Sequence, residues 1–442
     1  MTIQLSDHFT FKKLLRFTIP SVIMMIFTSI YGVVDGIFVS NFVGKAEFAA
    51  INFILPLCMI FGSIGFMIGT GGSALVSMTL GQKDSKKANE IFSFLIYFSA
   101  LFGILLSAVG VIFLEPILIA MGAEGEMLTN CLLYGRILIP ASVAFILQNE
   151  FQSFLVAAEK PKLGLFVTVA AGVTNIVLDT LFIAIFQWGI VGAAAATATS
   201  QFIGCIIPLI YFAASKKGSL RLGKARFMGK ALLKTCINGS SEMMVNLSMS
   251  TVNMIYNIQL MKIAGENGIA AFGVIMYVAF IFASVFIGFS IGSAPVISYH
   301  YGAENYDELK SLTKKTICIV AVLAVIMTVS AELLALPLSK IFVGYDKDLM
   351  EMTRYGFMIY SISFAFVGFN IFGSSFFTAL NNGIVSAVIS FVRTLLFQLI
   401  AIFTLPLIFG ITGVWLAVTA AELLSLVLTT GLFFKMKKYY KY

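Results

Sequence analysis

Long apolar stretches, separated by short polar segments, run along the whole chain. A helix needs about 20 apolar residues to cross roughly 30 Å of hydrocarbon, and these stretches reach or exceed that length. We therefore predict an all-α integral membrane protein with twelve transmembrane helices. The predicted spans lie at about residues 14–40, 47–80, 88–114, 128–158, 162–187, 190–214, 231–262, 268–300, 311–338, 350–380, 383–408 and 411–435.

The composition agrees with a membrane environment. Hydrophobic residues make up 59% of the 442 residues and charged residues only 11%, whereas soluble domains carry about 25% charged residues. The mean hydropathy is +0.98. We expect the lipid bilayer to be the main partner of the surface. The net charge of +8 needs no nucleic acid to explain it, because anionic lipids of the inner leaflet attract basic loops.

The basic residues predict the orientation. Most Lys and Arg fall in segments that a twelve-helix plan with both ends inside places in the cytoplasm, including the loop SKKGSLRLGKARFMGK at 215–230. Cytoplasmic loops are enriched in these residues, so we predict that both termini are cytoplasmic. We expect the loop to be a linker with little apolar surface to bury. The apolar run 17–34 is too long for a signal peptide and is predicted to be a retained span.

Residues that usually carry enzyme chemistry are few. Only His8 and His300 could supply an imidazole as general base. The cysteines stand singly and form no CxxC pair, which disfavours metal binding and disulfides. A membrane-embedded enzyme would need a His, Cys or metal constellation, so we predict neither an enzyme nor a cofactor. The cysteines are Cys58, Cys131, Cys205, Cys236 and Cys318.

The two halves of the chain repeat one another at a spacing of about 220 residues. GTGGSALVSMTLGQKDSKK (69–87) ends a span and opens a charged loop, as does SIGSAPVISYHYGAENYDELK (290–310), and GIVGAAAA at 189 matches GITGVWLA at 410. Six spans return the chain to the same side, so the halves are parallel repeats, which some secondary transporters use. We predict an N-terminal lobe at 1–214, a cytoplasmic loop at 215–230 and a C-terminal lobe at 231–442.

Two strongly polar side chains interrupt the apolar stretch VTNIVLDTLFIAIF at 173–186. An ionised Asp inside a membrane helix costs roughly 2.5–3.5 kcal/mol, so we expect Asp179 to have a functional or structural role. Asn175 precedes it by one helical turn, and residues i and i+4 share a helix face. The pair could bind one ion together, or it could join helices through interhelical hydrogen bonds.

The chain resembles the multidrug and toxic compound extrusion (MATE) family, in its DinF-like bacterial branch. The resemblance rests on the duplicated plan and on four motifs in order: IPSVIMMIFTSIYGVVDGIFVSNFVG, GQKD, NIVLDTLFI and GITGVWLA. It covers essentially the whole chain. It implies a multi-pass transporter of a bacterial cytoplasmic membrane, with two pseudo-symmetric six-helix lobes around a central cavity. Such a transporter couples the entry of Na⁺ or protons to the exit of a drug.

The resemblance also implies a coupling site in the N-terminal lobe. In related prokaryotic members this site uses an Asp of helix one, an Asn and an Asp one turn apart on helix five, and a Thr on helix six. By motif these positions fall on Asp35, Asn175, Asp179 and Thr197, which are the candidate ligands for Na⁺ or a proton. Tyr31, one turn before Asp35, also matches the family.

Some positions depart from the family pattern. After helix four the branch commonly reads Asn-x-x-x-Arg-Ala-x-Gly, whereas QSFLVAAEK places Gln152 at the Asn position, Val156 at the Arg and Glu159 at the Gly. Gln152 is therefore only a supporting or cavity candidate. By the repeat, Asp35 corresponds to Asn253, which cannot titrate. The second lobe is not expected to carry a second coupling site of the same kind.

Three charged residues lie within predicted spans of the C-terminal lobe. Glu242 either faces the cavity, where it would attract a cationic drug, or lies in the polar inner mouth. Arg393 and Glu422 lie on neighbouring spans at similar depth. Because an unpaired charge in lipid is costly, we predict that Arg393 and Glu422 form a structural polar pair, either directly at mid-membrane or through one intervening polar group.

The function expected from these observations is cation-coupled export of amphipathic, often cationic, drugs by alternating access between the lobes. The alternative within the same superfamily is a flippase for lipid-linked oligosaccharides, whose pyrophosphate would need several cavity Arg or Lys residues. The expected partners are small-molecule drugs or toxic organic cations. A monomer is the simplest expectation.

Overall fold

The computed structural model describes residues 3–215 and 218–442, except the side chains of Ile37, Ser40, Asn41 and Lys45. This part of the chain contains helices and no strands. The elements are α1 (Phe11–Phe42), α2 (Lys45–Gly81), α3 (Ser85–Ala120), α4 (Gly125–Ala157), α5 (Pro161–Asp179), η1 (Thr180–Ile185), α6 (Gly189–Ala214), α7 (Gly229–Gly302), α8 (Tyr306–Val343), α9 (Lys347–Ser361), α10 (Phe364–Ala379), α11 (Gly383–Phe391), η2 (Val392–Leu396), α12 (Phe397–Phe409) and α13 (Ile411–Tyr440).

The helices confirm the predicted all-α membrane fold. Among the described residues, ten helical segments are long and apolar enough to cross a membrane, and the bent pair α9 and α10 makes an eleventh. The 74-residue helix α7 contains two of the predicted spans. Gly265 breaks it between them, with φ 64° and ψ −152°, a conformation that favours glycine. Counting α7 twice gives the twelve predicted crossings.

The tenth predicted span is two helices instead of one. α9 ends at Ser361 and α10 begins at Phe364, with a bend of 50° between them. The Ser361 hydroxyl donates a hydrogen bond to the Glu332 carboxylate of α8, so a polar group at the bend has a partner. Hydropathy alone shows neither the bend nor this partner.

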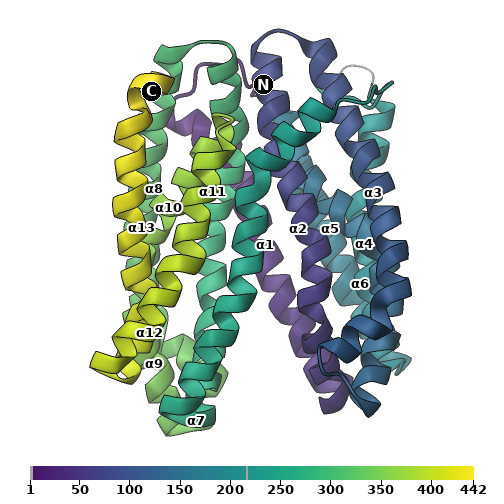
Figure 1. Ribbon diagram of the computed structural model, residues 1–442, viewed down its shortest axis with the longest axis vertical. Coiled ribbons are helices and arrows are strands. Elements are labelled where there is room, and N and C mark those ends of the chain that lie inside the picture. Colours follow the sequence, from purple (N-terminus) through teal and green to yellow (C-terminus); the bar gives the residue numbers. More distant parts are fainter. Residues whose placement is uncertain (1–2, 216–217) are drawn as a thin grey trace.

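The helices form two bundles (Figure 1). Helices α1 to α6 build one bundle and α7 to α13 the other. The bundles converge toward the end of the molecule that carries both termini, and they separate toward the opposite end. The chain between α6 and α7 also lies at the convergent end, which is the end predicted to be cytoplasmic.

The chain between α6 and α7 is more firmly held than the sequence predicted. Leu220 is fully buried. The backbone N–H of Arg221 donates to Asn89 Oδ1 of α3 over 2.7 Å, and the N–H of Gly223 donates to Ser93 Oγ over 2.9 Å. The expectation of a linker with little to bury is therefore wrong for residues 218–223. Lys216 and Lys217 lie outside the described residues.

Glycines allow the two bundles to touch through their backbones at the convergent end. A Cβ on Gly239 of α7 would lie 1.8 Å from the Met67 carbonyl oxygen of α2. Cβ atoms at three further glycines would lie 2.1 Å from a carbonyl oxygen of the other bundle. Because no side chain fits there, we call these positions the glycine seam: Gly71, Gly81, Gly239 and Gly302.

The turns repeat with the same spacing as the sequence motifs. Positive φ angles occur at Lys83 (64°) and at its repeat counterpart Glu304 (54°). Glu159 (62°) and Asn381 (57°) form a second such pair. In both halves these residues follow the end of a helix, where a left-handed residue commonly closes the last turn. Glu159 is the position at which the family pattern has Gly.

Residues 3–10, which we call the N-terminal strap, connect the two bundles at the convergent end. The Leu5 N–H donates to Glu159 Oε1 over 2.7 Å, between α4 and α5. The Phe9 N–H donates to Glu308 Oε1 over 2.9 Å, and His8 Nδ1 lies 2.6 Å from Glu308 Oε2 on α8. Leu5 and Phe9 are fully buried. The strap therefore has one anchor in each bundle.

Two ionisable groups at the strap have displaced pKa values. The Lys13 ammonium, 2.8 Å from Asp7, hydrogen-bonds the Asp7 carboxylate and lowers its pKa. Burial raises the pKa of Glu159, against the opposing effect of the hydrogen bond from Leu5. A carboxyl group that loses water is less easily ionised. Glu159 is thus a half-buried acceptor that hydrogen-bonds the strap.

Candidate functional site

Asn175 and Asp179 are buried on one face of α5. Their exposed fractions are 2% and 0%. The helix has 19 residues, so Asp179 lies roughly 27 Å along it from Pro161, at 1.5 Å per residue. The next six residues, Thr180–Ile185, form a π-helix. Such wider turns occur frequently at functional sites.

Asp35 of α1 faces the α5 pair. Its carboxylate lies within interaction range of the Asn175 amide and the Asp179 carboxylate. Tyr31, one turn earlier, is also close to Asp35, and its ring lies 6.0 Å from that of Phe27. The structure therefore brings together Asp35, Asn175 and Asp179, with Tyr31 beside them.

Thr197 reaches this cluster through a residue that sequence reasoning missed. Tyr134 of α4 is 4% exposed. Its hydroxyl interacts with the Thr197 side chain of α6, and it also lies close to Asp35 and Asp179. The sequence held little signal for this role, because Tyr134 is one of 15 tyrosines and stands in an apolar run. Helices α1, α4, α5 and α6 thus all contribute to the cluster.

The cluster offers more acceptors than donors. Neither carboxylate oxygen of Asp179 has a hydrogen-bond partner among the described residues. A buried charge normally requires a partner, and two adjacent carboxylates are not both ionised unless positive charge compensates them. Carboxylate, amide and hydroxyl oxygens are ligands for hard cations. These residues can therefore take up Na⁺, or hold a proton between the carboxylates.

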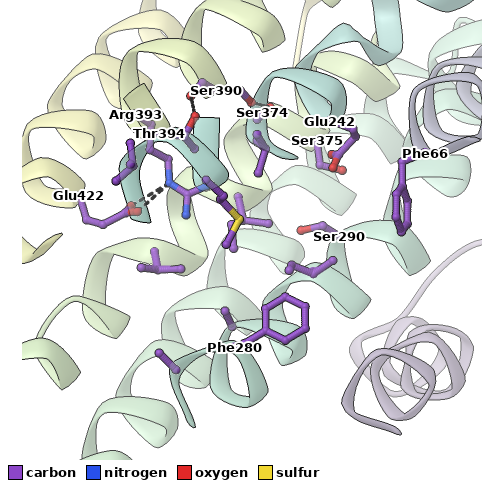
Figure 2. A pocket seen from close by; sticks show the side chains of 18 of the residues that line it. Phe66, Glu242, Phe280, Ser290, Ser374, Ser375, Ser390, Arg393, Thr394 and Glu422 are labelled. Carbon is purple, nitrogen blue, oxygen red and sulfur yellow. Dashed lines mark hydrogen bonds and ion pairs between the residues drawn. The ribbon is translucent and has the colours of Figure 1, made fainter. Parts of the chain in front are cut away.

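A cavity of about 240 Å³ lies in the second bundle and faces the first. Figure 2 shows it with Glu242 on one side and with Arg393 and Glu422 on the other. Phe66 of α2 closes it from the first bundle. Most of its remaining lining is apolar or carries hydroxyl groups, including Met249, Met276, Phe280, Ser290, Ser374 and Thr394.

The structure places the remaining sequence candidates as follows. Glu242 lines the cavity and is half-buried. Asn253, the repeat counterpart of Asp35, also lines the cavity and is half-buried. Gln152 is buried, and its Oε1 atom has no partner in the part of the chain that the structure describes; the neighbouring Ser153 lines the cavity instead. Glu150 is fully buried, and neither carboxylate oxygen has a partner among the described residues.

Arg393 and Glu422 meet. The Arg393 Nε atom lies 2.8 Å from Oε1 and 3.0 Å from Oε2 of Glu422. The Asn370 amide of α10 donates to Glu422 Oε2 over 2.7 Å, and Thr429 donates to Asn370 Oδ1 over 3.1 Å. Arg393 lies in the π-helical segment η2. This network joins α10, η2 and α13.

Sequence comparison gives the same duplicated arrangement. The MatE family model matches the chain twice, at residues 20–181 and 243–404. The multidrug export protein MepA of Staphylococcus aureus (strain MSSA476) is 24% identical over 418 residues, covering 94% of this chain and 92% of that protein. MepA of Staphylococcus saprophyticus is 25% identical over 366 residues, covering 81% and 80%.

Solved structures with this fold cover nearly the whole chain. One is the outward-facing conformation of a multidrug resistance MATE family transporter of the MOP superfamily, with a TM-score of 0.93 and 21% identity over 98% of this chain and 97% of that one. Another is a MOP superfamily transporter from Pyrococcus furiosus, described as having a binding pocket of reverse polarity, with a TM-score of 0.91 and 20% identity over 98% of both chains. These likenesses establish the two-lobe fold.

Proposed function

Because the chain belongs to the MatE family of membrane transporters, we propose that it is a multidrug exporter driven by entry of Na⁺ or protons. The relatives in sequence are multidrug export proteins, which supports efflux of small molecules. We place the coupling cation at Asp35, Asn175, Asp179 and Thr197, with Tyr31 and Tyr134 supporting them. The protein would lie in a bacterial cytoplasmic membrane with both termini inside.

The observation that carries this proposal is the unpartnered carboxylate of Asp179. It is fully buried, has no hydrogen-bond donor among the described residues, and faces Asp35. A group used only to join helices would have a hydrogen-bond partner on the neighbouring helix. A cation that enters the cluster would supply the missing positive charge.

Coupling follows if the cation changes how the four helices pack. A ligand shifts a conformational equilibrium only through its different affinity for the two states. Moving one charge through 100 mV provides about 2.3 kcal/mol, which corresponds to roughly a fifty-fold concentration ratio. One cation per cycle would thus be enough to concentrate an uncharged drug. One-for-one exchange with a monocationic drug moves no net charge, so there the concentration gradient of the cation would supply the free energy. The lobes would then alternate between openings at the two ends.

The cavity is the proposed drug site. Glu242 would attract a cation, and the Phe and Met side chains would adapt to apolar bodies of different shape. The cavity contains one basic side chain, Arg393, among its lining residues. A pyrophosphate-linked lipid would call for several, so nothing in the cavity favours the flippase alternative.

Uptake into proteoliposomes tests the proposal. Purified protein is reconstituted, and accumulation of ethidium is followed under an imposed Na⁺ gradient, an imposed proton gradient, or neither. We expect uphill ethidium movement with one of the gradients and none without. The Asp179→Asn variant should bind ethidium yet fail to concentrate it. Gradient-independent movement in the wild type, or full concentration by Asp179→Asn, would overturn the proposal.

A further inference from the structure

Arg393 uses only part of its hydrogen-bonding capacity. A guanidinium carries five N–H groups in a planar fork, and it often binds a carboxylate through two parallel bonds. Here both Glu422 oxygens accept from the single Nε–H group, at 2.8 and 3.0 Å. No acceptor in the described part of the chain hydrogen-bonds the two terminal Nη groups. The outer side of the fork is therefore free.

The free side of the guanidinium faces the cavity. Arg393 is a lining residue, and its side chain is 12% exposed. Figure 2 shows Nε turned toward Glu422, and the rest of the guanidinium reaches into the space between the helices. Two parallel Nη–H donors in a mostly apolar wall match the two oxygens of a carboxylate. A simple structural ion pair would not need this orientation.

Glu242 supplies the opposite charge on the other side of the same cavity. It comes from α7, whereas Arg393 comes from η2. Among the described residues, no salt bridge joins Glu242 to a Lys, Arg or His. The cavity thus presents one available carboxylate and one available pair of cationic donors, and its lining also includes apolar side chains such as Phe280 and Met249.

We propose that Arg393 forms a carboxylate-binding subsite, so that the cavity accepts zwitterionic amphipaths. The substrate carboxylate binds the Nη groups of Arg393, its cationic group lies toward Glu242, and its apolar body fills the space between them. Glu422 and Asn370 hold the guanidinium in place from behind. This inference rests on the proposed drug cavity and extends it from cations to molecules that carry both charges.

Two dyes that differ at one group test the subsite. Rhodamine 110 carries a free benzoate, and rhodamine 123 is its methyl ester, so the ester replaces the carboxylate with an uncharged group that is larger by one methyl. Equilibrium binding of each dye to the purified protein in detergent is measured by fluorescence polarisation. The quantity of interest is the ratio of the two dissociation constants, which does not depend on transport.

The variants separate the subsite from the ion pair. In Arg393→Gln/Glu422→Gln both charges are removed together, so no unpaired charge remains. We expect this variant to lose about tenfold in affinity for rhodamine 110, with little change for rhodamine 123. Glu422→Gln keeps a carbonyl acceptor that can hold the Arg393 Nε–H in place and removes only the competing negative charge, so rhodamine 110 should bind more tightly. Glu242→Gln should weaken both dyes.

The binding results that would overturn the subsite differ from the export results that would overturn the proposed function. Arg354→Gln, which removes an exposed Arg away from the cavity, is the matched control and should leave the ratio unchanged. An unchanged ratio in the double variant, weaker rhodamine 110 binding in Glu422→Gln, or no rhodamine 110 binding by a protein that still exports ethidium would each overturn the subsite. Absence of ethidium export would instead overturn the proposed function.

Discussion

At the scale of single residues, the two lobes use buried carboxylates in different ways. Asp179 has no partner among the described residues, whereas Glu422 accepts from both Arg393 and Asn370. The first arrangement has room for the proposed mobile cation, whereas in the second the carboxylate oxygens of Glu422 already accept hydrogen bonds from fixed donors. The difference leads to opposite expectations for substitutions at the two sites.

Substitutions at the proposed cation site (Asp35, Asn175, Asp179 and Thr197) should impair transport more than folding. We expect Asp179→Asn and Asp35→Asn to abolish concentrative ethidium export while helical content by circular dichroism stays unchanged. Asn175→Ala or Thr197→Ala removes one oxygen ligand and should weaken cation affinity by about tenfold, comparable to the loss of one hydrogen bond to a charged group. A Na⁺ or pH titration of export measures this shift. Wild-type export by either Asp variant would show that the coupling site lies elsewhere, and Glu242 would be tested next.

Substitutions at the Arg393–Glu422 pair should impair stability. Removing one member of a buried pair leaves the other charge unpaired, at a cost of about 3–5 kcal/mol. We expect Arg393→Ala and Glu422→Ala each to lower the melting temperature in detergent. The double variant should lose less than the sum of the single losses, and exchanging the two residues should restore part of the stability. Additive losses would mean that the two side chains do not interact.

At the scale of elements, the glycine seam decides how closely α2 and α7 approach. Gly239 of α7 contacts the backbone of Met67 in α2, so any residue larger than glycine at position 239 forces these two helices apart. Over-packing of this kind costs about 1–3 kcal/mol. Because the seam lies at the convergent end, the cost falls only on the state in which that end is closed.

We therefore expect Gly239→Val to shift the protein toward opening of the convergent end. Spin labels at Lys87 of α3 and Lys314 of α8, both exposed, would report a longer distance by electron paramagnetic resonance. Gly273→Ala, on the same helix but with nothing within 4 Å of the added Cβ, is the control and should leave the distance unchanged. An unaltered distance in Gly239→Val would mean that the seam does not control the closure.

The sequence predicted elements well where one helix alone determines the pattern. Hydropathy located the spans because lipid-facing and core positions are both apolar, and the family resemblance pointed to three of the helices in the cluster. The role of Tyr134, the bend after Ser361 and the burial of Leu220 depend on neighbours far away in the chain. No local pattern encodes such contacts, so they had to come from the structure.

At the scale of the whole molecule, the N-terminal strap holds both lobes at the convergent end. Its anchors are Glu159 in one lobe and Glu308 in the other. In the proposed alternating-access cycle, opening of that end would move the anchors apart, and at least one would have to release. The strap therefore favours the closed convergent end in addition to the glycine seam.

Removal of one anchor should expose the strap. In Glu308→Ala the Phe9 N–H loses a charged acceptor, a bond worth about 1.5–3 kcal/mol. We expect its protection from hydrogen exchange, measured by mass spectrometry in detergent, to fall by roughly tenfold or more. Asp307→Ala, one residue away and exposed, is the control. Equal protection of Phe9 in both variants would exclude Glu308 as an anchor.

The strap can be compared to a peptide ligand that is covalently attached to the protein that binds it, through the contacts at Glu159 and Glu308. Residues 3–10 lead directly into α1, so after each release the strap searches only a small volume. Short flexible tethers give effective concentrations in the millimolar range. Weak individual contacts are then enough for rebinding, and a separate peptide with the sequence of residues 3–10 would need roughly millimolar concentration to compete. In the proposed transport cycle, the attachment would therefore allow the strap to be released in every cycle and still to rebind when the convergent end closes.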